Sequence, residues 1–262
     1  MKSIQPVHTL RLSMELRELT IGQAQELCTI PYQYAQRTVT AFLNAACTPI
    51  PRPHGRPAVT DPLMMSVNER MHITVFYLAA MLDDGPDFQL GDGHLHDYLL
   101  AEADYVDRVP FEHRSERMFC TPLHGYQAEG IESLVETGAL PKTFFSWQLG
   151  VMAACVWGED ETPFEYRDPA SYSKKLLARI EELKGAPETD FVELFDAYSQ
   201  VSQSLQHFVH AVFNKEGVLA HQVTEPDVET GVPNLGLARF HPRTGISRGA
   251  CELLEAADQY EG

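Results

Sequence analysis

Apolar and polar residues alternate without a break from position 10 to 16, which predicts a half-buried strand. The spacing then becomes helical. Thr20 and Gln23 form a capping-box signature that predicts a helix ending near Ile30. A second helix is predicted over 32–47, where apolar side chains recur near one face. The chain is therefore expected to open with one strand and two short helices.

The rest of the body is predicted to be helical. Ser66 and Glu69 repeat the capping signature, and Asp168 followed by Pro169 gives the favoured order at a helix start. Helices are predicted over 66–82, 126–136, 142–157, 168–184 and 189–214, the last being the longest. Short strands are predicted at 117–122 and 218–223. The expected fold class is mainly α (α+β with a minor N-terminal strand region).

Two irregular segments are expected to interrupt or follow this body. Five prolines within 48–62 exclude regular structure there, and Arg52, His54 and Arg56 make this arm locally basic. The arm either lies on its own domain or clamps onto a neighbouring protein, and the sequence favours neither. After Gly217 apolar clusters become rare. The expected organisation is a helical body over 1–217, including the Pro-rich arm 48–62, and an extended C-terminal tail over 218–262.

The charge balance excludes one broad class of function. The 262 residues include 37 acidic and 20 basic side chains, a net charge of −17. A protein that binds nucleic acid by neutralising phosphates needs clustered Lys and Arg, so direct nucleic-acid binding is not expected. No apolar run is long enough to cross a bilayer, and the first residues do not resemble a secretory signal. The protein is therefore expected to be soluble, with no membrane partner.

Cysteine chemistry is expected to be inert. The five cysteines include no C-x-x-C pair, so neither a disulfide framework nor a cysteine zinc site is predicted. Cys28 and Cys155 lie among apolar residues and are predicted to be buried. Cys120 and His124 form the only local cysteine–histidine pair, and Pro122 between them indicates a turn.

Histidines offer the one candidate metal site. His94, His96 and Asp97 are of ligand types, and a site there would recruit His72 or His124. The competing interpretation is a solvated acidic loop leading into a helix.

A second histidine pair lies on the longest predicted helix. His207 and His210 stand three positions apart, on neighbouring faces, and the glutamate of an H-E-x-x-H site is missing. Satisfied interface or surface histidines are the favoured interpretation. Phosphate-binding loops, dinucleotide fingerprints and serine-hydrolase elbows are also missing from the sequence. No enzymatic activity, catalytic residue, metal ligand or cofactor is therefore predicted.

Three segments resemble a family of tailed-bacteriophage proteins. They are Leu19–Leu27; Ser66–Met71 with Asp83–Phe88; and Thr121–Gly125 followed by Ala128–Glu132. The arrangement is similar to virion morphogenesis proteins of the baseplate-hub or tail-assembly kind, which join an N-terminal strand segment to a mostly helical body. The resemblance covers about 10–213.

The resemblance implies a non-enzymatic structural or assembly role in a phage tail or baseplate. The partners would be other virion tail or baseplate proteins in a hetero-oligomer, contacted through the 48–62 arm and the 218–262 tail. The location would be the virion or the host cytoplasm.

Two other functions remain open from the sequence. The first is a metal-dependent enzyme that uses His94, His96 and Asp97. The second is an acidic decoy that imitates phosphate charge, because carboxylates are concentrated in 83–107 and 159–165.

Overall fold

The protein is an α+β protein in the computed structural model. The model describes residues 4–52, 58–81, 87, 89–90, 93–100, 105–215, 217–222 and 236–238. Of these described residues, 49% are helical and 20% lie in strands. The prediction of a mainly α fold with only a minor N-terminal strand region is therefore wrong. The short strands expected at 117–122 and 218–223 are present as parts of three-stranded antiparallel sheets, whose other strands were not predicted.

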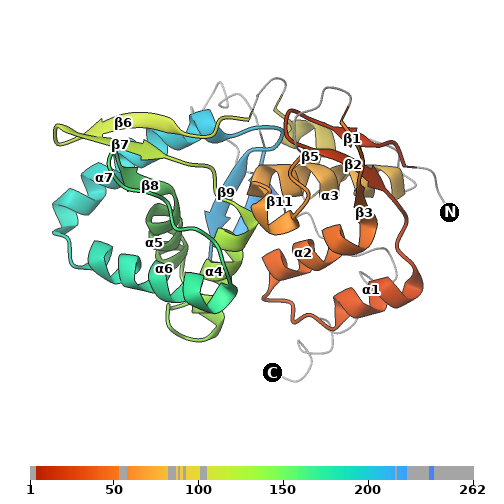
Figure 1. The fold of residues 1–262 in the computed structure, drawn as a ribbon, viewed down its shortest axis with the longest axis horizontal. Coiled ribbons are helices and arrows are strands. Elements are labelled where there is room, and N and C mark those ends of the chain that lie inside the picture. Colours follow the sequence, from red (N-terminus) through yellow and green to blue (C-terminus); the bar gives the residue numbers. More distant parts are fainter. Residues whose placement is uncertain are drawn as a thin grey trace.

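The N-terminal part packs helices beside a small antiparallel sheet in the order β1-β2-β3 (Figure 1). Its strands are β1 (Val7–His8), β2 (Ser13–Leu16) and β3 (Cys47–Pro49). Its helices are α1 (Ile21–Cys28), α2 (Ala35–Ala46), the 3-10 turn η1 (Pro62–Met64) and α3 (Val67–Met81). The predicted strand and the two helices after it are present as β2, α1 and α2, although β2 begins later than expected and its partner β1 was not predicted.

The opposite half of the molecule contains a second antiparallel sheet, ordered β6-β7-β8, with four helices packed beside it. Its strands are β6 (Val109–His113), β7 (Glu116–Cys120) and β8 (Val156–Gly158). Its helices are α4 (Gly125–Glu136), α5 (Phe144–Cys155), α6 (Pro169–Lys184) and α7 (Glu188–Ser202). α5 is the central buried helix, and its Gly150 lies so close to Ile131 that a Cβ would stand 2.8 Å from that side chain.

A third antiparallel sheet, ordered β11-β10-β9, lies between the two halves (Figure 1). It contains β9 (Ala211–Asn214), β10 (Gly217–His221) and β11 (Leu237–Ala238). The strand predicted at 218–223 is confirmed as β10. Smaller elements are β4 (Gln89–Leu90), β5 (Gly93–His94), η2 (Leu95–Tyr98) and η3 (Gln203–Leu205).

The long predicted helix over 189–214 is wrong in its second half. α7 ends at Ser202, Phe208 takes a left-handed backbone conformation with φ of 62°, and 211–214 pair with β10. The apolar spacing in this stretch fits a helix and a strand equally well, and pairing with β10 decides between them. A similar error joined β8 to α5, because Val156 and Trp157 continue the apolar run of the helix.

Local helix signals were predicted correctly. The Thr20–Gln23 and Ser66–Glu69 capping pairs and the Asp168 N-cap are present. Burial of Cys155 is also confirmed, whereas Cys28 is exposed near the end of α1, contrary to prediction.

The described ends of the 48–62 arm contact the chain's own N-terminal strands. The amide of Ile50 donates to the Ser13 carbonyl at 3.0 Å, and that of Val59 donates to the Arg11 carbonyl at 3.0 Å. Arg52 also donates to the Thr9 carbonyl at 2.9 Å. The arm therefore lies on its own domain at both ends, while 53–57 fall outside the described residues. The 223–235 and 239–262 parts of the predicted tail likewise fall outside them.

None of the described helices combines the length and the apolar character that membrane crossing requires.

Candidate functional site

The acidic loop that carries the predicted metal ligands is held by its own ion pairs. The His96 ring lies between two carboxylates, with Nδ1 2.8 Å from Asp87 and Nε2 3.1 Å from Asp97. The hydrogen bond to Asp87 raises the pKa of His96, which favours the doubly protonated ring. The amide of His94 donates to Asp97 at 2.8 Å, and its ring meets the Asp87 carbonyl at 3.2 Å. In the described part of the chain, no group of three or more His, Cys, Asp or Glu is placed to hold a metal ion.

The other predicted histidines have separate packing partners. The His72 ring stacks on Phe208 with centroids 4.3 Å apart, and His124 Nε2 lies 3.5 Å from the Tyr105 hydroxyl. Burial lowers the pKa of His72 and that of His124 to about 4, so both rings are neutral near pH 7.

The predicted cysteine–histidine pair carries no activated nucleophile. Cys120 is buried, and burial raises the pKa of its thiol to about 12. Burial also raises the pKa of Cys155 well above its ordinary range. Both thiols are therefore protonated near neutral pH, whereas a nucleophilic cysteine needs a thiolate.

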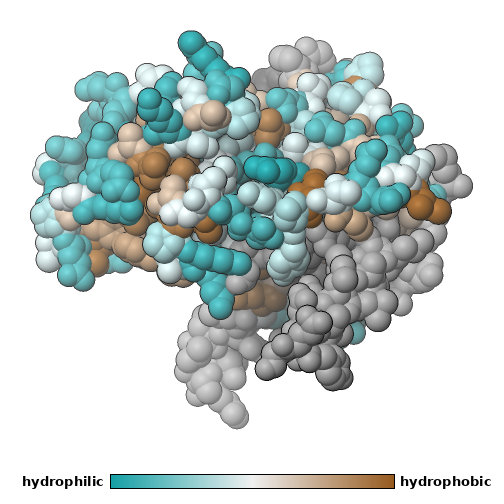
Figure 2. Space-filling model, turned by 90° about the horizontal axis from the view of Figure 1, so that it is seen from below, coloured by the Kyte–Doolittle hydropathy of each residue, from teal (hydrophilic) through white to brown (hydrophobic). Residues whose placement is uncertain are grey.

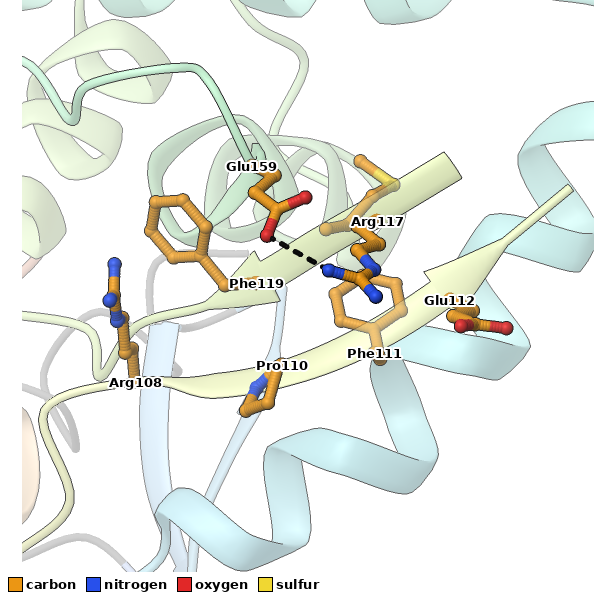
Figure 3. Close-up of a pocket in the computed structure, with 8 residues that line it drawn as sticks. Arg108, Pro110, Phe111, Glu112, Arg117, Phe119 and Glu159 are labelled. Atoms are coloured by element: carbon orange, nitrogen blue, oxygen red, sulfur yellow. Dashed lines mark ion pairs between the residues drawn. The ribbon is translucent and has the colours of Figure 1, made fainter. Parts of the chain in front are cut away.

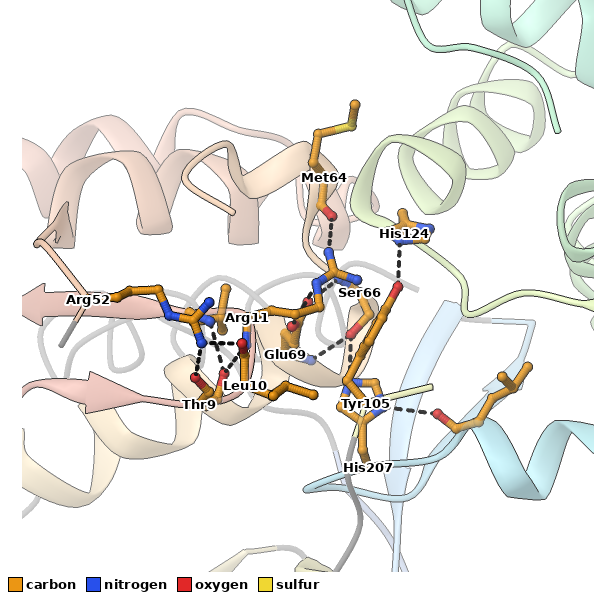
Figure 4. A network of polar contacts seen from close by, with 12 residues as sticks. Thr9, Leu10, Arg11, Arg52, Met64, Ser66, Glu69, Tyr105, His124 and His207 are labelled. Carbon is orange, nitrogen blue, oxygen red and sulfur yellow. Dashed lines mark hydrogen bonds and ion pairs between the residues drawn. The ribbon is translucent and has the colours of Figure 1, made fainter. Parts of the chain in front are cut away.

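A serine–histidine pair joins the N-terminus of α3 to the segment before β9 (Figure 4). Ser66 Oγ and His207 Nε2 lie 2.9 Å apart, and the other ring nitrogen lies 2.9 Å from the Leu205 carbonyl. A proton on Nδ1 would be donated to that carbonyl, which leaves Nε2 to accept the serine proton. Both side chains are fully buried, and Ser66 Oγ also accepts from the Glu69 amide at 3.1 Å. The pair therefore fastens α3 in place and gives a substrate no access.

The prediction that His207 and His210 are neighbours on a helix is wrong, because α7 ends at Ser202, before both of them. His210 packs instead against the ring of His221 on β10, with centroids 5.1 Å apart. The sequence could not show the Ser66 contact, since it joins residues far apart along the chain.

Arg11, which lies between β1 and β2, contacts the residues around the Ser66–His207 pair (Figure 4). Its guanidinium lies 3.8 Å from the centre of the Tyr105 ring, 3.5 Å from Glu69 and 3.0 Å from the Met64 carbonyl. Burial raises the pKa of Glu69, while Arg11 acts in the opposite direction. The arginine thus supplies charge compensation to a buried carboxylate.

A second buried network joins α2, α3 and α4, and no sequence pattern indicated it. Arg70 is fully buried, donates to the carbonyls of Gln36 at 2.5 Å and Pro62 at 3.2 Å, and lies 3.7 Å from Glu129. Glu132 on α4 accepts from the Gln36 amide at 2.9 Å. It also accepts from the next amide of α2 at 3.2 Å, so it caps that helix from across the fold. Burial raises the pKa of Glu132 to about 7.

The outer face of the β6-β7-β8 sheet carries an open groove of about 480 Å³ (Figure 3). Its lining combines two cations, two carboxylates and four apolar side chains: Arg108, Arg117, Glu112, Glu159, Pro110, Phe111, Met118 and Phe119. The strand register sets Pro110 opposite Phe119 and Glu112 opposite Arg117. The volume is within the range of ligand pockets, and the mixed lining matches a site that binds one polar group on an apolar floor.

A pair of aromatic side chains stands exposed at the start of α5. Phe144 and Phe145 are 50% and 54% exposed, and the Phe145 ring lies 5.4 Å from that of Phe191 on α7. Val192, which follows Phe191 on α7, is 49% exposed. These four residues are here called the Phe144 patch. Figure 2 shows apolar side chains gathered over the half of the molecule that holds α5, α6 and α7.

No family model, curated protein or solved structure matches this chain.

Proposed function

We propose that this protein is a non-enzymatic structural or assembly component of a phage tail or baseplate and acts through contacts with other proteins. The resemblance of three sequence segments to tail-assembly and baseplate-hub proteins supports this role. The observation that carries the proposal is the Phe144 patch.

The patch has the chemistry of a protein contact. A phenylalanine buries 150–250 Å² when covered, and each Å² of apolar area removed from water contributes about 25 cal/mol. Two half-exposed rings on the rigid first turn of a helix therefore offer several kcal/mol to a partner, and lose little conformational entropy on binding.

The rim of the patch favours a particular partner surface. The first turn of α7 carries Glu188 three positions before Phe191, while Asp190 is already paired with Arg114 at 2.7 Å. The expected partner is a virion protein that presents an apolar surface bordered by basic side chains, since like charges facing each other would disfavour the contact.

The buried chemistry supports a role without catalysis. Ser66 and His207 are inaccessible and serve as helix anchors, and the buried thiols are held in their protonated forms. The His96 ring is already paired with two carboxylates of its own loop, those of Asp87 and Asp97. No observation on the described residues favours the metal-dependent enzyme or the acidic decoy over the assembly role.

Incorporation into purified particles tests the proposal. Wild-type protein is expected in a mass-spectrometric census of the assembled tail or baseplate. The double variant Phe144→Ser/Phe145→Ser is expected to fold with an unchanged melting temperature and to be missing from particles. Ile21→Ser is the matched control, because Ile21 is 78% exposed on a different helix. Absence of the wild-type protein, or equal incorporation of the double variant, would contradict the proposal.

A further inference from the structure

The groove on the β6-β7-β8 sheet is an apolar face that the chain leaves partly uncovered. Phe119 pairs with Pro110 on one side and with Trp157 on the other. Trp157 is covered, since Arg179 lies 4.1 Å from its ring centre and Phe164 packs edge-on at 5.1 Å. The groove opens at the other end of this row, where Pro110 is exposed and Phe119, of which 7% remains accessible, contributes to the lining (Figure 3).

Arg108 is the cation at the open end. It lies 5.4 Å from the centre of the Phe119 ring, and the ion pairs between described residues do not include it. Arg117 across the groove is paired with Glu159 at 3.6 Å. In a chain with a net charge of −17, an arginine that has no ion pair within the described part of the chain and lies beside an aromatic ring favours an anionic group on the ligand.

The edges of this sheet are closed to strand addition, so a ligand must approach the face. Pro110 lies on the edge strand β6 and has no amide hydrogen to donate. On β8, the Arg179 guanidinium donates to the Val156 carbonyl at 2.9 Å. The Gly158 amide donates to Glu161 at 2.7 Å. The backbone groups that a new strand would need are thus already occupied.

The two carboxylates of the groove limit the charge of the ligand. Glu112 and Glu159 stand on its lining beside the arginines. A nucleotide polyphosphate would place several negative charges near both of them, whereas a single carboxylate can meet Arg108 alone.

From this geometry we infer that the groove binds a short acidic and apolar segment of a partner protein, with a carboxylate on Arg108 and an apolar side chain on Phe119. The inference rests on the proposed assembly function, for which it names the chemistry of a second partner. It adds a contact separate from the Phe144 patch, since the two surfaces share no residue.

Titration with a blocked Leu-Glu-Leu tripeptide, followed by NMR, tests the inference. At millimolar concentration the peptide is expected to shift the amide signals of Phe119 and Gly158, while the matching Leu-Lys-Leu peptide shifts neither. Arg108→Glu is expected to weaken binding of the acidic peptide about tenfold and to bind the lysine peptide instead. The control Arg167→Glu alters an exposed arginine paired only with Glu165 and should behave as wild type.

Several results would overturn the inference. They are no shift with the acidic peptide, equal binding by Arg108→Glu, or a larger shift with ATP than with the peptide. A wild-type dimer in sedimentation that Arg108→Glu dissolves would assign the groove to a second copy of the chain. The Phe144→Ser/Phe145→Ser variant should still bind the peptide, so failure of the assembly proposal and failure of the groove are separately observable.

Discussion

Two groups of arginines and glutamates in this protein share the same chemistry and differ in their surroundings. Arg70, Glu129 and Glu132 are enclosed between α2, α3 and α4, where backbone hydrogen bonds and opposite charges hold them in place. Arg117 and Glu159 border the groove and are 72% and 60% exposed. The buried group is fixed by the fold, whereas the exposed pair is screened by water and contributes at most about 1 kcal/mol.

The difference in burial separates charges that stabilise the fold from charges that are free to contact a partner. A buried charge that loses its partner costs several kcal/mol, so the buried network constrains how the helices pack. The groove charges have little effect on stability. Their arrangement around an apolar floor is therefore available for recognition of a partner.

Breaking the buried network should have the largest effect. Arg70→Met leaves the Gln36 and Pro62 carbonyls without their donor and Glu129 without its cation. The free energy of unfolding is expected to fall by about 3–5 kcal/mol in urea denaturation. Arg117→Met is the matched change in the groove and should cost less than about 1 kcal/mol. Equal losses in the two variants would remove the distinction between the groups.

The pH dependence of the buried network sharpens the contrast. Because the pKa of Glu132 is raised to about 7 in the folded protein, its contribution to stability is larger at low pH and declines as pH rises from about 4.5 to 7. Glu132→Gln should therefore lose more stability relative to wild type at pH 5 than at pH 8, with a difference of up to about 3 kcal/mol. Urea midpoints at the two pH values measure this difference, and parallel curves for wild type and Glu132→Gln would contradict the assignment.

The smallest effect is expected in the turn of the hairpin that carries the groove. Arg114 and Ser115 have φ of 50° and 67°, which glycine adopts with less strain. Ser115→Gly should raise the free energy of unfolding by about 0.5 kcal/mol while leaving the Arg114 pairs with Asp190 and Glu193 intact. A loss of stability would mean that the Ser115 side chain contributes more than its backbone strain costs.

Local signals along the sequence predicted the helix starts at Thr20 and Ser66, because a capping box needs residues only three apart. The strands β6, β8 and β9 were missed. β8 pairs with β7, which lies far away along the chain. β6 and β9 each pair with the next strand of a hairpin, but their short apolar stretches do not by themselves distinguish a strand from a loop or a helix. The sites were less predictable still. Glu132 caps a helix 96 positions away, and the groove exists only through the register of Pro110 with Phe119.

Hydroxyl-radical footprinting of the protein, free and within purified particles, tests the central claim most directly. The account predicts that oxidation of Phe144 and Phe145 falls sharply on assembly, while Ile21, 78% exposed on α1, remains as reactive as in the free chain. Unchanged oxidation of both phenylalanines in the assembled state would contradict the claim that this protein acts through the Phe144 patch.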